Sequence, residues 1–147
     1  MSVIDEMVCF SVYSASHAFT QAYRRALAPW RLTYPQYLVL VALWDRAPRS
    51  VKDLGAELQL DSGTLSPLLR RLEARELITR ARQVGDERVV EISLTQSGQA
   101  LQTEMRGVAV DVARCTGLKP ERARDLLAAV HEMTDTLRQA TEASASR

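Results

Sequence analysis

The sequence contains little cysteine, little histidine and almost no net charge. Two cysteines among 147 residues are too few for a disulfide-stapled scaffold, so we expect free thiols in a reducing compartment. His17 and His131 lie far apart and neither has metal-ligand spacing with a cysteine, so no metal site is expected. A formal charge of +1 gives no general affinity for nucleic acid or membranes, and any DNA contact must therefore come from locally placed charge.

Long apolar runs and catalytic signatures are also missing from the sequence. No stretch approaches the roughly 20 apolar residues of a membrane-spanning helix, and residues 1–6 lack the basic start of a signal peptide. We therefore expect a cytoplasmic protein without membrane contacts. Neither a phosphate-cradling glycine loop nor a nucleophile-elbow motif is present, so we expect no cofactor and no enzymatic activity.

The apolar residues that are present suffice for one core. A chain of 147 residues that is 46% hydrophobic and 25% charged fits a single domain. The predicted fold class is mainly α with a small β-wing. Residues 31–94 are expected to form a winged helix-turn-helix DNA-binding unit, flanked by N- and C-terminal dimerisation helices in residues 1–30 and 95–142.

The DNA-binding unit is predicted from the order of elements in residues 50–95. A short helix capped by Ser50 comes first, with an apolar face of Val51, Leu54 and Leu58. A polar turn leads to a second helix whose core face consists of Leu65, Leu68, Leu69 and Leu72. This helix begins either after Asp61, which we expect, or after Ser66, with Pro67 at its first position. Two β-rich runs, 77–80 and 89–94, follow with a charged tip at 84–88.

The second helix carries small hydroxyl groups and arginines away from its leucines. These candidate DNA contacts are Ser62, Thr64, Ser66, Arg70 and Arg71. Hydroxyl groups reach phosphates and base edges without bulk, and arginine can pair with guanine through two hydrogen bonds. Arg88 in the tip could enter a minor groove. The charges alone would also fit ordinary surface residues, since residues 61–88 contain six arginines and five acids, so the order of elements is the evidence.

The flanking regions are expected to be long helices. Residues 3–28 are predicted as one helix with too much apolar surface to remain uncovered. Thr33 is expected to cap a second helix with a wide apolar stripe. Thr95 is expected to start a helix that ends near Gly117, and Pro120 to open the last helix, with a polar tail that frays from Ala140. Long terminal helices on both sides of a compact DNA-binding unit indicate dimerisation.

The candidate reactive group lies on the first helix. Cys9 precedes Tyr13 by four residues, so their side chains share a helical face. All four tyrosines, at positions 13, 23, 34 and 37, fall within one quarter of the sequence. A thiol attacks a peroxide only as the thiolate, which needs donors or positive charge nearby, and tyrosine hydroxyls can be such donors. The alternative is that Cys9 and the tyrosines are ordinary core residues.

The predicted DNA-binding segment resembles the MarR family of winged-helix repressors. The similar residues are LDSGTLSPLLRRLEARELITR, then Asp86 and Arg88 of an Asp-x-Arg wing motif, and Leu94 and Thr95 at the start of the next helix. The resemblance covers essentially the whole chain. It implies a single MarR-type domain, 1–147, that binds a palindromic operator in double-stranded DNA as a homodimer, with Asp86 and Arg88 among the DNA-binding residues.

The N-terminal motifs resemble the OhrR branch of that family, the organic-hydroperoxide sensors. Cys9, Phe10 and Tyr13 match a CF-x-x-Y pattern, and residues 33–37 match TYPQY. The resemblance implies that Cys9 is the peroxidatic cysteine and that its thiolate is hydrogen-bonded by two tyrosines of the partner subunit, at the positions of Tyr23 and Tyr34, with Tyr13 nearby. It also implies that DNA is held in the reduced state and released on oxidation.

Cys115 resembles the resolving cysteine of the two-cysteine OhrR subgroup. In that role it would form a disulfide with Cys9 of the other subunit, which requires movement because a disulfide joins Cα atoms no more than about 7 Å apart. If Cys115 instead only fills a helix end, oxidation would stop at a mixed disulfide with a small thiol.

The sequence also fits two other functions. A repressor controlled by a small aromatic ligand, bound between the dimer helices and the reader, would leave Cys9 incidental. A thiol peroxidase that turns over is disfavoured, because a peroxidase needs neither a recognition helix nor a wing.

Overall fold

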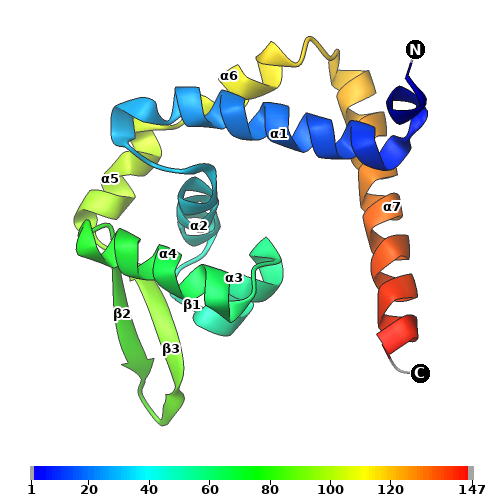
Figure 1. The fold of residues 1–147 in the computed structure, drawn as a ribbon. Helices are drawn as coiled ribbons and strands as arrows, with labels where there is room; N and C mark the ends of the chain where they lie inside the picture. Colours follow the sequence, from blue (N-terminus) through cyan, green and yellow to red (C-terminus); the bar gives the residue numbers. More distant parts are fainter. Residues whose placement is uncertain (1, 146–147) are drawn as a thin grey trace. The chain divides into compact units, whose positions relative to one another are not determined.

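The computed structural model describes residues 2–145, which form helices and one three-stranded antiparallel sheet (Figure 1). The chain divides into two compact units, one ending at Val112 and the other starting at Ala113. The prediction of a mainly α fold with a small β-wing is confirmed. In chain order the elements are η1 (Val3–Glu6), α1 (Val8–Ala26), η2 (Ala28–Trp30), α2 (Tyr34–Asp45), β1 (Arg49–Ser50), α3 (Val51–Leu58), α4 (Ser62–Ala74), β2 (Ile78–Gln83), β3 (Asp86–Leu94), α5 (Gln96–Glu104), α6 (Val108–Cys115) and α7 (Pro120–Ala145).

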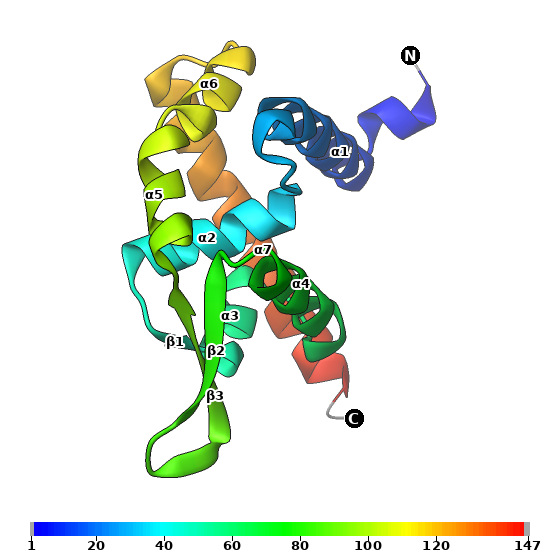
Figure 2. The ribbon, with the colours of Figure 1, turned by 90° about the vertical axis from the view of Figure 1, so that its left-hand side faces the viewer.

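The core lies where helices α2 to α5 meet the base of the sheet. The side chains of Leu40, Leu54, Leu72 and Ile92 are fully buried there, one each from α2, α3, α4 and β3. Their burial fixes the angle between α3 and α4 and holds the hairpin of β2 and β3 against them. As Figure 2 shows, this hairpin projects from the core beside α3 and α4, which is the arrangement of a winged helix-turn-helix.

Three polar caps determine where the helices of this unit begin, and all three were predicted. The Thr33 hydroxyl accepts the Gln36 N–H at 3.4 Å and starts α2, with proline in the first turn. Ser50 accepts an N–H at 3.0 Å to start α3. Asp61 Oδ1 accepts the Thr64 N–H at 2.9 Å and starts α4, so the earlier of the two candidate starts is confirmed.

Two predicted helices are each divided in the structure. The helix expected over residues 3–28 breaks at Met7, whose backbone is extended, because the Asp5 carboxylate accepts the Ser2 N–H at 3.0 Å and closes a separate 3₁₀ turn. The helix expected from Thr95 to Gly117 breaks at residues 105–107 into α5 and α6. The apolar spacing is maintained across this second break, which is why the sequence did not indicate it.

The C-terminal helix is longer than predicted. Fraying was expected from Ala140, but α7 continues to Ala145. The Thr141 and Ser144 hydroxyls donate to carbonyl oxygens one turn earlier, so their side chains bond within the helix. Residues 146–147 of the predicted tail lie outside the described residues.

The wing is also longer than predicted, and its tip is tighter. The strands reach Gln83 and Asp86, so Val84 and Gly85 alone form the turn, with Gly85 at φ +98°. Arg88, expected in the tip, belongs to β3. A third strand, β1, was missed, because it consists only of Arg49 and Ser50, paired with Ile92 and Glu91 of β3.

The junction between wing and α5 is packed backbone against backbone. The Thr95 N–H donates to the Leu77 carbonyl at 3.1 Å, and the Thr95 hydroxyl donates to the Glu76 carbonyl at 2.6 Å. Gly98, in the first turn of α5, lies so close that an added Cβ would be 2.0 Å from the Leu77 oxygen. The Trp44 indole N–H donates to the Gly98 carbonyl at 2.9 Å, which ties α2 to the same junction.

Helix α1 is almost bare. None of its 19 residues is buried, and residues 8–21 are all exposed. Val8, Val12 and Phe19 are 67%, 38% and 40% exposed although their spacing of four and seven places them on one face, here called the α1 stripe. An uncovered apolar stripe on a long helix is typical of a surface that packs against a partner, because exposed apolar area is unfavourable in water.

Candidate DNA interface and thiol site

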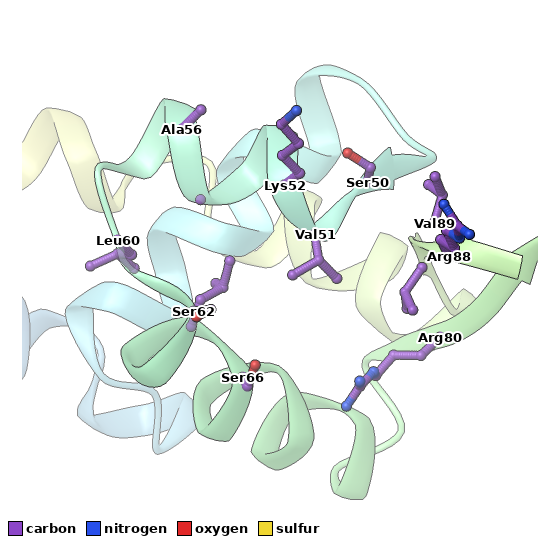
Figure 3. Close-up of a pocket in the computed structure, with 13 residues that line it drawn as sticks. Ser50, Val51, Lys52, Ala56, Leu60, Ser62, Ser66, Arg80, Arg88 and Val89 are labelled. Carbon is purple, nitrogen blue, oxygen red and sulfur yellow. The ribbon is translucent and has the colours of Figure 1, made fainter. Parts of the chain in front are cut away.

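A groove opens between α3, α4 and the wing. It encloses about 710 Å³, and its lining has no carboxylate. The lining residues are Ser50, Val51, Lys52, Gly55, Ala56, Leu60, Ser62, Leu65, Ser66, Arg80, Arg88, Val89 and Val90. Figure 3 shows Lys52 of α3, Ser66 of α4 and the two wing arginines around the same space. A lining with three cationic side chains, three hydroxyl groups and no acidic side chain is suited to contact the phosphate backbone of DNA.

The groove brings together three of the predicted DNA residues. Ser62 and Ser66 lie one turn apart on α4 and face it, and Arg88 borders it from β3. Arg70 and Arg71 are exposed further along α4 and do not line the groove. The recognition face therefore continues along α4 beyond the groove, with hydroxyl groups near its start and guanidinium groups near its end.

Two other predicted DNA residues are engaged in local structure. The Thr64 hydroxyl donates to Asp61 Oδ2 at 3.1 Å, and hydrogen bonds from Thr64 lower the pKa of the Asp61 carboxyl. Asp86 Oδ1 accepts the Arg88 N–H at 3.0 Å. Thr64 thus stabilises the start of the recognition helix, and Asp86 fixes the backbone that presents Arg88.

Three polar groove residues were not predicted as DNA contacts from the sequence, namely Ser50, Lys52 and Arg80. Lys52 was detectable in principle, because a cation in the first turn of a helix opposes the helix dipole and indicates another use for the charge. Arg80 lies in β2 and pairs with Ile92 of β3. The sequence alone did not indicate which face of the wing its side chain would occupy.

Cys9 lies at the exposed start of α1 and is a free thiol. Tyr13 follows one turn later and is 61% exposed; its ring contacts Phe10 at a centroid distance of 6.4 Å and His17 at 4.5 Å. The predicted proximity of Cys9 and Tyr13 on one helical face therefore follows from the continuous helix. Cys9 is exposed in the subunit, so the alternative that it is a buried core residue does not hold within a single chain.

The other three tyrosines form a cluster at the opposite end of α1. The rings of Tyr23 and Tyr34 stack at 4.1 Å, and Tyr37 lies 5.8 Å from Tyr23. Burial, with smaller contributions from the phenols of Tyr34 and Tyr37, raises the pKa of Tyr23 to about 12. Burial also raises the pKa of Tyr34. Both hydroxyl groups therefore remain protonated at neutral pH and can donate hydrogen bonds.

The thiol and this tyrosine cluster are far apart within one chain. Cys9 and Tyr23 are 14 residues apart on the unbroken helix α1, which at 1.5 Å per residue is roughly 21 Å. The predicted hydrogen bonds to the Cys9 thiolate therefore cannot form within the subunit.

Cys115 is the last residue of α6 and is also an exposed free thiol. Thr116 and Gly117 follow, and Gly117 has φ +67°, so the predicted helix end there is confirmed. Among residues 2–145 no cluster of three His, Cys, Asp or Glu side chains is placed to bind a metal ion. Within the same range, no helix combines the length and the apolarity of a membrane span.

Comparison with known proteins gives consistent matches to DNA-binding regulators. A family model described as transcriptional regulator SarA/Rot matches residues 21–105. The chain is 48% identical over 134 residues to the HTH-type transcriptional regulator TtmR of Methylorubrum extorquens, covering 91% of this chain and 69% of that protein. It is 38% identical over 136 residues to the organic hydroperoxide resistance transcriptional regulator of Bacillus subtilis, covering 92% of each chain.

Solved structures match the fold over most of its length. Reduced AbfR bound to DNA has a TM-score of 0.76 and 34% identity, with 88% of this chain and 91% of that chain covered. The disulfide-formed state of AbfR, a protein of Staphylococcus epidermidis, has a TM-score of 0.62 and 36% identity, with 92% and 90% covered. BpsR of Bordetella bronchiseptica, whose DNA binding is regulated by 6-hydroxynicotinic acid, has a TM-score of 0.84 and 27% identity, with 92% and 98% covered.

Proposed function

The chain belongs to the SarA/Rot family of winged-helix transcriptional regulators, and within it we propose that this protein is a redox-sensing repressor. It is a DNA-binding regulator rather than an enzyme, and its fold is of the MarR type. In the proposed function a reduced homodimer binds a palindromic operator in the cytoplasm. Oxidation of Cys9 by an organic hydroperoxide releases the DNA.

The observation that carries the proposal is the placement of Cys9 and Tyr23 on one bare helix. Because roughly 21 Å of helix separates them, the Cys9 thiol can reach the hydroxyl of a Tyr23 only on another copy of the chain. If two α1 helices pack antiparallel about a two-fold axis beside Ser16, midway between these residues, each Cys9 meets the tyrosine cluster of the partner subunit. The α1 stripe supplies the apolar area for that contact.

The proposed chemistry takes place in two steps. The Cys9 thiolate attacks the outer oxygen of the hydroperoxide, the O–O bond breaks, and an alcohol leaves after gaining a proton, so Cys9 becomes a sulfenic acid. The protonated hydroxyls of Tyr23 and Tyr34 are suited to stabilise the thiolate. The thiol of Cys115 in the other subunit then attacks the sulfenic sulfur, forming a disulfide and releasing water.

The relatives support this assignment by their names. One is an organic hydroperoxide resistance regulator, and AbfR has been solved both reduced on DNA and with a disulfide. A second candidate function is a repressor controlled by a small aromatic ligand, as the name of BpsR indicates for that protein. A hollow of about 460 Å³ between α2 and α5 favours it, because Tyr37 and Trp44 line it and could hold an aromatic ring, with Arg106 and Asp45 beside it.

A gel mobility shift on a palindromic promoter fragment tests the redox function. We expect stoichiometric cumene hydroperoxide to release the parent protein and to leave Cys9→Ser bound, because serine cannot form a sulfenic acid. Cys115→Ser is expected to lose the intersubunit disulfide on a non-reducing gel and to show altered reversal by dithiol. If Cys9→Ser is released as readily as the parent, the thiol is not the sensor and the ligand-controlled repressor is favoured.

Lys52 is expected to contact a phosphate of the operator. Replacing it with glutamine should weaken binding of the reduced protein to all duplexes to a similar degree and reduce the slope of log K against log salt by about one. Fluorescence anisotropy from 50 to 200 mM salt measures both quantities. Lys119→Gln, in the segment between α6 and α7, removes the same charge from a residue that does not line the groove and should leave the slope unchanged. An unchanged slope in Lys52→Gln would exclude the contact.

A further inference from the structure

One arginine at the C-terminus of the recognition helix α4 hydrogen-bonds to the backbone that follows α1. Arg75 caps the C-terminus of α4, and its guanidinium donates from Nη1 to the Arg31 carbonyl at 2.9 Å and from Nη2 to the Trp30 carbonyl at 2.7 Å. Both carbonyls belong to the corner between α1 and α2, residues 27–33, here called the α1–α2 corner. A planar fork with two donors to consecutive carbonyls fixes orientation as well as distance.

The same corner is attached to α1 and to α5. Leu27, which follows the last residue of α1, is fully buried, so the corner and the end of α1 move together. The Trp30 indole N–H donates to Glu104 Oε2 at 2.9 Å, at the last residue of α5. The α1–α2 corner therefore connects three elements: the helix that carries Cys9, the recognition helix, and the helix that leads to α6.

We infer that Arg75 is a positioning residue that transmits displacement of α1 to the recognition helix. A shift of α1 moves the carbonyls of Trp30 and Arg31, and the guanidinium takes the C-terminal end of α4 with them. Without the fork, α4 stays on its leucine core when the corner moves. The inference rests on the proposed function for the origin of the displacement, and on the hydrogen bonds alone for its route.

Arg75 could instead contact a DNA phosphate directly, and the two roles respond differently to lysine. Lysine keeps the charge and so preserves a phosphate contact and its salt dependence. It has no planar fork and cannot reproduce the paired bonds to consecutive carbonyls. Arg75→Lys is therefore the informative variant. Arg124→Lys is its control, since Arg124 lies on α7, is 76% exposed, and forms only a long ion pair with Glu121, 3.9 Å.

Operator affinity is measured by fluorescence anisotropy on a labelled duplex selected from a random pool by the reduced parent protein. We expect reduced Arg75→Lys to bind within about threefold of the parent with the same salt slope. The loss of affinity on oxidation should be at least about fivefold smaller than in the parent and in Arg124→Lys, the scale of one or two net hydrogen bonds. An oxidation loss equal to that of the parent overturns the inference and favours the direct phosphate contact.

Hydrogen exchange supplies a readout that a general loss of stability does not reproduce. In the parent, oxidation should speed exchange in peptides covering both residues 27–33 and residues 70–78. In Arg75→Lys the change should be confined to 27–33. Equal changes in both peptides of the variant would mean that the signal reaches α4 by another route.

A redox-independent cycle separates failure of this inference from failure of the proposed function. If peroxide does not affect DNA binding by the parent, redox sensing fails, and the corner is judged on reduced protein alone. Arg75 and Glu104 contact the corner from different helices, so Arg75→Lys and Glu104→Ala should affect operator affinity non-additively, by more than twofold. Additive effects within twofold would overturn the coupling.

Discussion

Gly98→Ala is expected to lower the free energy of unfolding by about 3 kcal/mol, because the new methyl group meets backbone. Its Cβ would lie 2.0 Å from the Leu77 carbonyl oxygen and 3.2 Å from Leu94 Cδ2. A backbone carbonyl cannot rotate aside as a side chain can, so α5 must move away from the wing. Overpacking of this kind typically costs about 1 to 3 kcal/mol before any hydrogen bond is lost.

The movement would also break the hydrogen bonds of the junction. The Thr95 N–H and hydroxyl donate to the Leu77 and Glu76 carbonyls, and each bond contributes about 1 kcal/mol net. Alanine recovers about 1 kcal/mol through its helix propensity, which leaves a net loss near 3 kcal/mol. For a chain of this size the melting temperature should fall by roughly 6 to 12 °C.

Thermal unfolding followed by circular dichroism, with both proteins reduced and at equal concentration, measures this loss. Gly107→Ala is the matched control, because its added Cβ would meet only Asp111 Oδ2, at the ordinary distance of 3.5 Å. That variant should melt within about 2 °C of the parent. If Gly98→Ala also melts within 2 °C of the parent, α5 is not packed as closely against Leu77 as described.

The second large effect is expected on dimerisation. Phe19→Asp places a charge in the α1 stripe, and two-fold symmetry introduces the change twice in each dimer. Losing the remaining burial of one phenylalanine and desolvating an aspartate in its place together cost about 1.5 to 3 kcal/mol, so the dimer should lose about 3 to 6 kcal/mol. The dissociation constant should rise by a factor of roughly 10² to 10⁴. Operator affinity should fall with it, since a monomer reaches only one half-site.

Sedimentation equilibrium of the reduced proteins tests this expectation. Ser14→Asp is the control, because Ser14 is exposed on the same helix, about 140° away from Phe19 around the helix axis. It adds the same charge and should leave the dissociation constant within about threefold of the parent. A Phe19→Asp protein that dimerises as well as the parent would exclude the α1 stripe as the interface, and with it the proposed approach of Cys9 to the tyrosine cluster.

Capping residues and apolar periodicity explain why most of the winged helix-turn-helix unit could be predicted. Ser50 and Asp61 each precede an apolar helical repeat by the distance that a cap requires, and the structure confirms both caps. The wing was predicted less well, because residues 80–88 are polar on both strand faces and lack the alternation that marks strand length. The break between α5 and α6 was missed for the opposite reason, since Leu101, Met105 and Val108 keep helical spacing through it.

The candidate site was predicted where it depends on residue type and missed where it depends on tertiary contacts. Cys9, Tyr23 and Tyr34 were singled out from the sequence, the tyrosine stack is present, and the helix predicted over residues 3–28 already implied the roughly 21 Å between Cys9 and Tyr23. Lys52 and Arg80 enter the groove through the packing of α3 and the wing. Arg75 was counted only as one more surface charge, because nothing in its neighbourhood in the sequence indicates the carbonyls of the α1–α2 corner.

The uninterrupted length of α1 also bears on how a dimer counts oxidation events. In the proposed antiparallel pair each Cys9 lies seven residues from the symmetry axis, on opposite sides, so the two thiols are separated by roughly 21 Å. They cannot be oxidised to a disulfide with each other, and each must be converted by its own peroxide molecule. The two thiols of a dimer are thus oxidised independently, and the dimer passes through a half-oxidised species. The operator affinity of that species determines whether one or two oxidation events release the DNA.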